Sequence, residues 1–513
     1  MPMWKFALPI TAALTAATTL AGCLFPSGVG LPDEPTVGSV LANNAAGRLL
    51  NLRAGADGVS VPLTANRSAF FLINTQSRTA GTVQVAITAN QPAAAYRTAA
   101  LAPVEAALPG IGATSFEPKL RGWEASLKGV TPGPRRYKTL QAPGYALGDT
   151  ERFWVISEMD GADVGEVQVS AKAAYVGEHC YVFVDEKAPG AEAMAARAQV
   201  MGKAFDEQIF PTNSRLFGNP VASGVNGDAR ITLLVSPAVG NYGRDTTIGY
   251  FTVRDLFKPE DDPSQAILKR SNRRLMLYMS SHVVSRGQAA DYLGTVAHEF
   301  EHLINASQRL FATGAKATED VWLDEGLAMY AMEANGYGLG GAGGVVYSHV
   351  AAYQAQPERY SLTHWQLNPD ESAYGAAYLY TTYLVDRFGE EILKKLVTSP
   401  SVGIANLQGV LGTYDATFED VFEDWTAANM FDHTGVTTDP RFNYKRINML
   451  GTYGNRRLRG MTLSAVKVPN VGTLELKPYS ARYYYVPRPA AGDFRFSLTA
   501  ETTQRFGGWL VAP

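Results

Sequence analysis

Two histidines separated by three residues are the part of this sequence best suited to chemistry. In the stretch TVAHEFEHLINASQ (295–308), His298 and His302 flank Glu299 in the pattern HExxH. Apolar residues recur through this stretch at helical spacing, which predicts an amphipathic helix. Residues four apart lie on one face of a helix, about 5–6 Å apart at Cβ, so both imidazoles can bind one cation. Glu299 is rotated by one residue, which suits a general base that reaches a metal-bound water without binding the metal.

A metal site of this kind needs a third protein ligand from elsewhere in the chain. In the metzincins this ligand is a histidine six residues after the second one, following a glycine. The chain has Asn305 and Gln308 at those positions and does not fit that class. A glutamate on a later helix is the alternative, and EDVWLDEGLAMYAME offers Glu325 after a loop long enough to reverse the chain. Other carboxylates of this segment are rivals for the same role: Glu319, Asp320, Asp324 and Glu333.

Three segments together resemble the hyicolysin-type metallopeptidases, a gluzincin group: HEFEHLIN, WLDEGLAMY and YGAAYLYTTYLVDRFG. The resemblance covers roughly residues 177–435. It implies a zinc peptidase domain in which Glu325 is the third zinc ligand, on a helix antiparallel to the HExxH helix. Thermolysin is a poorer match, because its Asp four residues after the ligand is Met329 here. Which residues orient the rings of His298 and His302 is therefore an open question at the level of the sequence.

The same resemblance bears on the substrate and on the oxyanion. Aminopeptidases of this clan bind the substrate amine with a GxMEN loop just upstream of the HExxH helix, and its absence there favours an endopeptidase. Tyr374, in SAYGAAYLYTTYL, occupies a place similar to the tyrosine that stabilises the oxyanion in aminopeptidase-N-like gluzincins. A packing role for Tyr374 together with Tyr378 and Tyr383 is the alternative, and His364 is a rival donor. An extended substrate is expected to pair with the strand predicted at 274–279.

The N-terminus predicts export and anchoring. Residues 1–22 combine one lysine with a short apolar segment, as in a secretory signal peptide, and this segment is too short for a stable membrane span. Its end, LAGC, resembles the lipobox of bacterial lipoproteins, which implies cleavage before Cys23 and acylation of that cysteine. An ordinary signal peptide with a chance cysteine is the alternative. Leu24 in place of Asp implies an outer-membrane lipoprotein that faces the periplasm or the cell exterior.

The composition limits the classes of molecule that this protein is expected to bind. The formal net charge is −3, from 45 basic and 48 acidic residues without a basic stripe, so nucleic acid is a poor candidate. The sequence has 2 cysteines. If Cys23 carries lipid, Cys180 has no partner within the chain, and a disulfide framework is excluded. The expected partners are a protein or peptide substrate and the membrane, reached through the lipid.

The pattern along the chain predicts an α+β fold, with a gluzincin-type metallopeptidase domain between two β-rich parts. Alternating apolar residues predict a β-sandwich-like N-terminal part and a C-terminal β module, while the middle reads as a small sheet followed by a helical half. The predicted helices are 191–210, 289–307, 319–334, 373–388 and 417–430. The predicted boundaries are 1–22 signal peptide, 23–45 tether, 46–176 N-terminal β-rich domain, 177–438 zinc metallopeptidase domain and 439–513 C-terminal β module.

These observations together predict a lipid-anchored, secreted zinc metallo-endopeptidase. It would bind Zn²⁺ through His298, His302 and Glu325 and use Glu299 as general base. One alternative is a surface binding or adhesion lipoprotein with a vestigial peptidase fold, against which the intact Glu299 argues. The other is a zinc hydrolase that acts on a non-peptide ester or amide.

Overall fold

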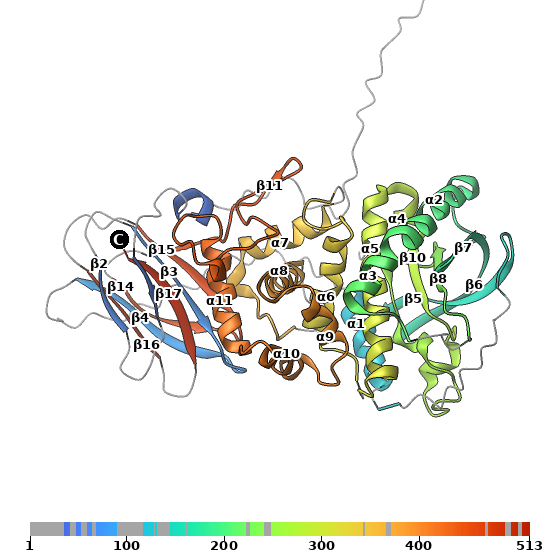
Figure 1. The fold of residues 1–513 in the computed structure, drawn as a ribbon, viewed down its shortest axis with the longest axis horizontal. Helices are drawn as coiled ribbons and strands as arrows, with labels where there is room; N and C mark the ends of the chain where they lie inside the picture. Colours follow the sequence, from blue (N-terminus) through green and yellow to red (C-terminus); the bar gives the residue numbers. More distant parts are fainter. Residues whose placement is uncertain are drawn as a thin grey trace, which may run out of the picture.

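The structure is a computed structural model, and it describes the following residues: 35–41, 48–52, 59–63, 68–89, 116–127, 129–130, 144–160, 163–221, 226–240, 248–315, 317–341, 344–365, 371–466, 470–487, 494–500 and 505–512. The predicted signal peptide and Cys23 lie outside the described residues, as does most of the tether. Helices and strands are both abundant in the described part, so the fold is mixed α and β. The molecule is elongated, with sheets at both ends and helices between them (Figure 1).

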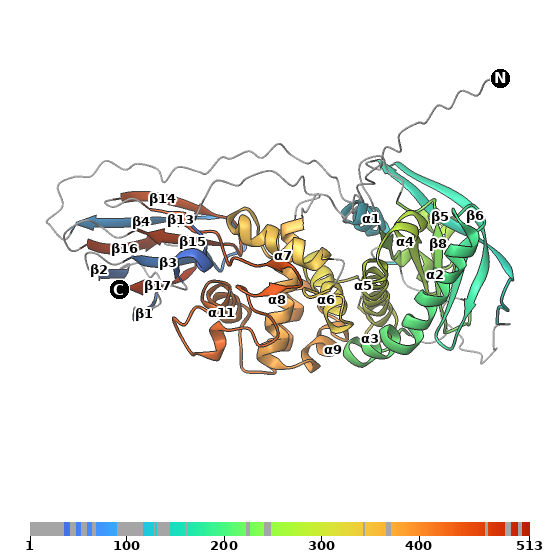
Figure 2. The same ribbon diagram turned by 90° about the horizontal axis from the view of Figure 1, so that it is seen from above.

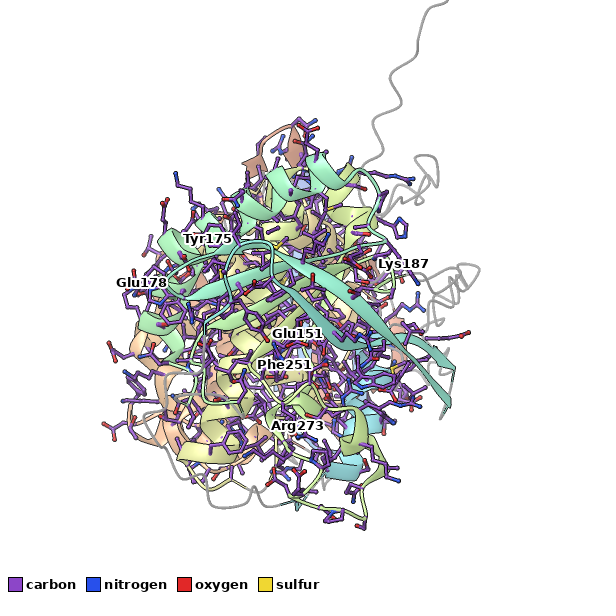
Figure 3. All side chains as sticks on the ribbon, turned by 90° about the vertical axis from the view of Figure 1, so that its right-hand side faces the viewer. Glu151, Tyr175, Glu178, Lys187, Phe251 and Arg273 are labelled. Carbon is purple, nitrogen blue, oxygen red and sulfur yellow. The ribbon has the colours of Figure 1, made fainter. Side chains whose placement is uncertain are left out.

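One end of the molecule is a mixed sheet with the strand order β5-β6-β7-β8-β10-β9. Its strands are β5 (Thr150–Asp160), β6 (Asp163–Val176), β7 (Cys180–Asp185), β8 (Ile231–Ser236), β9 (Gly249–Tyr250) and β10 (Met276–Ser280). The inner strands β7, β8 and β10 are parallel, and β5, β6 and β9 add antiparallel strands at the two sides. Figure 3 views the molecule from this end, with Glu151 of β5 and Phe251 just after β9 near the centre.

Both faces of this sheet are covered, which explains why β8 and β10 are buried along their whole length. One face packs on α2 (Ala191–Ala204), α4 (Ser281–Arg286) and α5 (Ala289–Ser307). The other face encloses a separate apolar core together with α1 (Phe116–Glu124). Helix α3 (Phe210–Phe217) continues from α2 through a π-helical turn, Phe205–Ile209, and also packs on α5.

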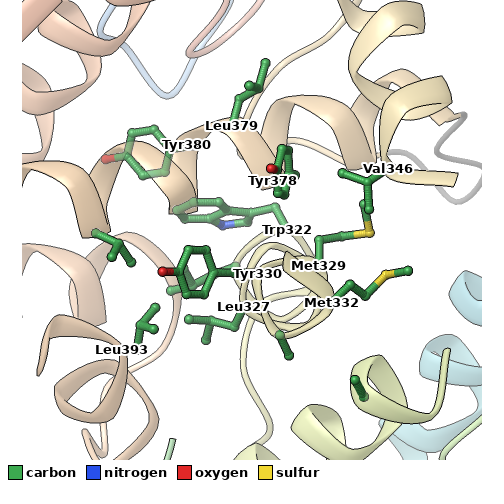
Figure 4. Close-up of a cluster of buried hydrophobic side chains, with 14 of the residues drawn as sticks. Trp322, Leu327, Met329, Tyr330, Met332, Val346, Tyr378, Leu379, Tyr380 and Leu393 are labelled. Atoms are coloured by element: carbon green, nitrogen blue, oxygen red, sulfur yellow. The ribbon is translucent and has the colours of Figure 1, made fainter. Parts of the chain in front are cut away.

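A helical layer fills the middle of the molecule (Figure 2). Its helices are α6 (Val321–Ala334), α7 (Val345–Ala355), α8 (Glu371–Phe388), α9 (Glu391–Val397), α10 (Gly403–Gly412) and α11 (Phe418–Phe431). Helix α6 is apolar on nearly every side, as expected for a helix surrounded by others. Figure 4 shows Trp322, Met329 and Tyr330 of α6 among Tyr378 and Tyr380 of α8.

The other end is a β-sandwich whose two described sheets draw strands from both ends of the chain. One sheet has the order β1-β17-β3-β15-β13 and the other β14-β4-β16-β2. The strands are β1 (Arg48–Asn51), β2 (Val59–Leu63), β3 (Ala69–Thr75), β4 (Gly81–Ala89), β13 (Ser464–Ala465), β14 (Asn470–Leu476), β15 (Ala481–Val486), β16 (Phe494–Ala500) and β17 (Phe506–Ala512). A short hairpin, β11 (Thr452–Tyr453) with β12 (Arg456–Arg457), precedes β13.

Alternation along β3 joins the sandwich to the helical layer. Phe71 and Ile73 point into the apolar core between the two sheets, whereas Phe70 and Leu72 point to the core shared with the helices. A buried polar contact supplements this packing, because Glu423 of α11 accepts hydrogen bonds from Asn51 Nδ2 at 2.7 Å and Gln76 Nε2 at 2.9 Å. The sandwich and the helical layer therefore share one apolar core.

The strand pairing differs from the predicted division into domains. Strands within 46–176 do not form a unit of their own: β1–β4 pair with strands from 464–512, while β5 and β6 belong to the sheet that carries β7. The physical reason is that β17 inserts between β1 and β3, and β16 between β2 and β4, so each supplies hydrogen bonds that its neighbours need. The predicted N-terminal and C-terminal β modules are thus one sandwich.

The predicted secondary structure is confirmed for the long periodic segments, such as the helices at 289–307 and 373–388. Cys180 is fully buried in β7. No helix within the described ranges combines the length and the apolar character that crossing a membrane requires.

Candidate metal centre

Helix α5 carries the HExxH residues on a long, almost wholly buried helix. Its start is fixed by a capping box, in which the side chains of Gln288 and Asp291 exchange hydrogen bonds with each other's backbone N–H groups. From Tyr292 onward every residue except Thr295 is buried. Both histidines therefore sit on a helix that packing holds in place.

Helix α6 brings Glu325 to the same point and runs antiparallel to α5. The two ends of the pair show this: Met332 lies against Gly294, and Asp324 lies against His302. This direction agrees with what the sequence resemblance implied. Gly326 allows α8 to approach closely, because a Cβ there would lie 2.5 Å from Thr381 Oγ1 and 3.0 Å from the Ala377 carbonyl oxygen.

Three ligand atoms converge between α5 and α6. His298 Nε2 lies 3.1 Å from His302 Nε2 and 3.2 Å from Oε2 of Glu325, and His302 Nε2 lies 3.6 Å from the same oxygen. Ligands that bind zinc tetrahedrally at about 2.0–2.1 Å are separated from each other by about 3.3 Å. The three spacings match the face of such a tetrahedron, and the fourth corner is left for another ligand.

The chemistry of this donor set fits zinc. Two imidazole nitrogens and one carboxylate oxygen are borderline ligands that suit Zn²⁺ in a catalytic site with three protein ligands. Oε2 of Glu325 is buried and accepts no hydrogen bond from any described residue, and the same holds for Oε2 of Glu299. Buried carboxylate oxygens without a donor are costly, and a cation would compensate for that cost.

A second group of side chains lies on the far side of the His302 ring, next to its Nδ1 atom. Asp324 Oδ2 is 3.1 Å from His302 Nδ1, and Asp324 Oδ1 accepts a hydrogen bond of 3.1 Å from Asn305 Nδ2. The same amide group of Asn305 also donates to Glu301 Oε1 at 3.4 Å. A carboxylate on the outer nitrogen of a metal-binding histidine fixes the ring and its tautomer. Asp324, one of the predicted rival ligands, lies at this position.

Charges around His302 and Glu325 shift their titration in opposite directions. Burial lowers the pKa of His302, but the carboxylates of Asp324 and Glu325 outweigh it and hold the pKa well above its ordinary value. Burial raises the pKa of Glu325, but His302 and His298 lower it more strongly. Burial and then Asp324 raise the pKa of Glu301 well above its ordinary value. The lowered pKa favours the anionic form of Glu325.

The remaining carboxylates of the segment have other partners. Glu319 forms a buried ion pair with Arg309 at 3.1 Å and accepts a hydrogen bond from Asn406 at 2.6 Å. Glu333 accepts hydrogen bonds from the hydroxyl of Tyr378 and from the backbone of Leu339, both at 2.8 Å. Asp320 is the residue that precedes α6. Glu325 is therefore the glutamate that the fold brings to both histidines.

The two predicted oxyanion donors have the following surroundings. Tyr374, near the start of α8, stacks on His349 with ring centroids 5.3 Å apart and contacts Trp365 edge-on at 5.1 Å. His364 is exposed, and its Nδ1 lies 3.1 Å from the hydroxyl of Thr363. The ring of Tyr374 thus has a packing role. Its role toward the oxyanion stays a prediction.

The predicted substrate strand is corrected by the sheet order. The segment 274–279 contributes β10, which lies inside the sheet with β8 on one side and β9 on the other. Because Tyr278 and Met279 are already paired with β9, the backbone there is not open to an added strand. The edge of the sheet beside α5 is β9 and the residues that follow it.

Comparison with known proteins supports a relationship to metallopeptidases. The chain is 29% identical over 254 residues to the neutral metalloprotease ShpI of Staphylococcus hyicus. The match covers 46% of this chain and 52% of the relative, so the chain spans about half the length of the curated relative it matches. No protein-family model matches the chain. The sequence similarity supports a metallopeptidase relationship, and His298, His302 and Glu325 form a group that could hold a metal ion.

Proposed function

We propose that the chain is a zinc metallo-endopeptidase of the gluzincin type, in which His298, His302 and Glu325 hold the metal. The observation that carries this proposal is the set of spacings of 3.1, 3.2 and 3.6 Å among the three ligand atoms. The similarity to a metalloprotease supports it. The donor atoms come from two separate helices, α5 and α6, and a chance pair of histidines on one helix would not bring Glu325 with it.

Each residue of the proposed site has a separate role in peptide hydrolysis. Bound zinc supplies Lewis acidity, which acidifies a water molecule and polarises a carbonyl oxygen. Glu299 takes the proton of the attacking water and passes it to the leaving amine. Asp324 orients the ring of His302 through Nδ1, and Asn305 donates a hydrogen bond that positions the Asp324 carboxylate. Tyr374 is assigned to the oxyanion, with His364 as the rival donor.

The experiment combines metal analysis with digestion of a peptide library by the purified chain. We expect about one zinc per chain, cleavage within peptides rather than at their ends, loss of activity with a chelator and recovery with zinc. Glu299→Gln keeps the metal ligands, so its zinc content should stay near one while cleavage falls to background. Full activity in Glu299→Gln would show that the peptidase assignment is wrong. A zinc-loaded chain that cleaves esters but not peptides would favour the non-peptide hydrolase.

We also propose that the protein is exported and anchored to the outer membrane through lipid on Cys23. The support is the LAGC sequence after a short apolar segment. Cys23→Ser should move the protein from the membrane fraction to the soluble fraction, and intact-mass analysis of the wild-type protein should show acyl chains. An unchanged distribution together with an unacylated mass would contradict the anchor.

A further inference from the structure

Among the strands of the described ranges, β9 is the last of its sheet, so its outer side is a sheet edge with a defined set of backbone groups. Ser280 N donates to the carbonyl of Ile248, and Tyr250 is paired with Tyr278, so residues 248 and 250 face β10. Alternate residues of a strand present their N–H and C=O to the same side, so 249, 251 and 253 face outward. Thr252 keeps an extended backbone, with φ −125° and ψ 126°, and continues this alternation. We call residues 249–253 the β9 edge.

The β9 edge runs beside α5 and past the proposed catalytic residues. At one end, a Cβ placed on Gly249 would lie 3.0 Å from Cγ2 of Thr295. At the other end, Phe251 and Val253 line a small void together with His302. Glu299 lies between Thr295 and His302 along α5. An extended peptide that added to the β9 edge would therefore lie alongside the metal centre.

Two side chains of α1 already bind the outward groups of the β9 edge. Arg121 Nη1 donates to the carbonyl oxygen of Phe251 at 3.4 Å, and Glu124 Oε1 accepts from the backbone N–H of Val253 at 2.8 Å. The same Glu124 oxygen accepts from the hydroxyl of Thr252 at 2.6 Å, and Arg121 and Glu124 pair with each other at 2.8 Å. The carbonyl of 251 and the N–H of 253 are the acceptor and donor that an added strand would use.

Helix α1 is held in this position by its apolar side. Leu120 is fully buried, and Phe116 packs on Tyr250 of β9 with ring centroids 5.1 Å apart. Figures 1 and 2 both show α1 next to α5 at the side of the sheet. Glu299 is 3% exposed and Glu325 1% exposed. The scissile carbonyl of a substrate must approach Glu299 and the metal position, and both are buried in this arrangement.

We propose that α1 is an autoinhibitory segment: it occupies the β9 edge, mimics a bound strand through Arg121 and Glu124, and must leave before a peptide can bind. This inference rests on the proposed function, because it identifies what keeps the substrate away from that site. The competing role is a permanent cover, since proteins commonly shield open sheet edges with a helix. The two roles predict opposite effects on activity when α1 is loosened or tightened.

Two substitutions in α1 act in opposite directions. Glu124→Ala removes the acceptor for Val253 N–H and should loosen α1. Gly122→Ala should tighten it, because a Cβ at Gly122 meets nothing within 4 Å and alanine favours the helix. Released α1 is too short to stay helical in water, so stabilising the helix favours the bound state, by roughly fivefold. Each variant is assayed for kcat/KM on a peptide, for hydrogen exchange of the segment containing Val253, for zinc content and for Tm.

Autoinhibition predicts that Glu124→Ala exchanges faster at Val253 and cleaves faster than wild type, although its Tm is lower. Gly122→Ala should exchange and cleave more slowly. If exchange changes as predicted while kcat/KM falls or stays constant in Glu124→Ala, α1 is a fixed cover and the proposal is overturned. If Glu124→Ala does not fold, Gly122→Ala decides: slower exchange with unchanged cleavage overturns the proposal.

Failure of the proposed function would look different. In that case the zinc-loaded wild type and both variants would all lack peptidase activity. The rate of zinc loss to a chelator then tests α1 by itself. Faster loss from Glu124→Ala and slower loss from Gly122→Ala would support α1 as the gate to the site, and equal rates in all three proteins would overturn it.

Discussion

At the scale of single residues, Asp324 and Glu325 are neighbours with different tasks. Glu325 Oε2 faces the inner nitrogens of both histidines, while Asp324 Oδ2 faces the outer nitrogen of His302. Adjacent residues on a helix point about 100° apart, so one turn of α6 can supply both a ligand and the group that orients another ligand. This explains why two carboxylates in sequence are useful here rather than redundant.

Substitutions at these two positions should separate the tasks. Glu325→Ala removes a ligand, and the purified protein should lose most of its zinc. Asp324→Asn leaves the three ligands in place, so zinc should remain near one per chain at saturating metal, with an affinity weakened about 10–100-fold. Competition with a zinc chelator measures both. Full zinc retention by Glu325→Ala would contradict the ligand assignment, and an unchanged affinity in Asp324→Asn would show that Asp324 does not orient His302.

Tyr374 can be tested without disturbing its packing. Phenylalanine keeps the ring that stacks on His349 and contacts Trp365 edge-on, so this packing should persist in Tyr374→Phe and the fold should be retained in a melting experiment. Loss of an oxyanion donor should lower kcat by roughly 10²–10³-fold and leave KM nearly unchanged. Tyr378→Phe is the control, because it loses a hydrogen bond to Glu333 and should lower Tm without a comparable loss of kcat. A fully active Tyr374→Phe would transfer the assignment to His364.

At the scale of elements, the geometry of the proposed metal centre depends on the distance between α6 and α8. Gly326 follows the proposed ligand directly, and the backbone and side chain of α8 fill the space that a Cβ would need. Well-packed interiors do not absorb an added methyl group without shifting a neighbour. The glycine in WLDEG therefore sets how deeply α6 can sit, and with it the position of Glu325 relative to α5.

Gly326→Ala should push α6 and α8 apart, at a cost of about 1–3 kcal/mol from overpacking. We expect a lower Tm together with weaker zinc binding, because Glu325 moves with α6. Gly409→Ala in α10 is the matched control, since a Cβ there meets nothing within 4 Å and the substitution favours the helix. Thermal unfolding with and without added zinc measures both effects. Equal Tm and zinc affinity in Gly326→Ala and wild type would refute the role of this contact.

At the scale of the whole molecule, the β-sandwich couples the two ends of the chain. β16 lies between β2 and β4, and Leu498 of β16 is buried in the core between the sheets. Strands that are distant in sequence but adjacent in a sheet share one cooperative unit. The sandwich in turn packs on α11 of the helical layer, with Glu423 at the contact.

A charge in β16 should therefore unfold strands near the other end of the sequence. Leu498→Asp buries an unpaired carboxylate and should cost several kcal/mol. The consequence is faster hydrogen exchange in β4 (81–89), about 400 residues upstream. Thr499→Asp is the control, because this neighbouring side chain is exposed and should leave exchange unchanged. Protection of β4 that survives Leu498→Asp would show that the N-terminal strands are stable without β16.

The sequence by itself determined the features that depend on local pattern. The HExxH spacing placed two histidines on one helix face, and the helices at 289–307 and 373–388 followed from apolar periodicity. Tertiary structure decided what depends on contacts between distant segments. It placed Asp324 behind His302, made one sandwich of strands from both ends of the chain, and put α1 on the β9 edge. Strand periodicity specifies which face is buried but not which strand pairs with which. The backbone hydrogen bonds of a ladder are alike for every sequence, so the partner is selected by the packing of distant segments.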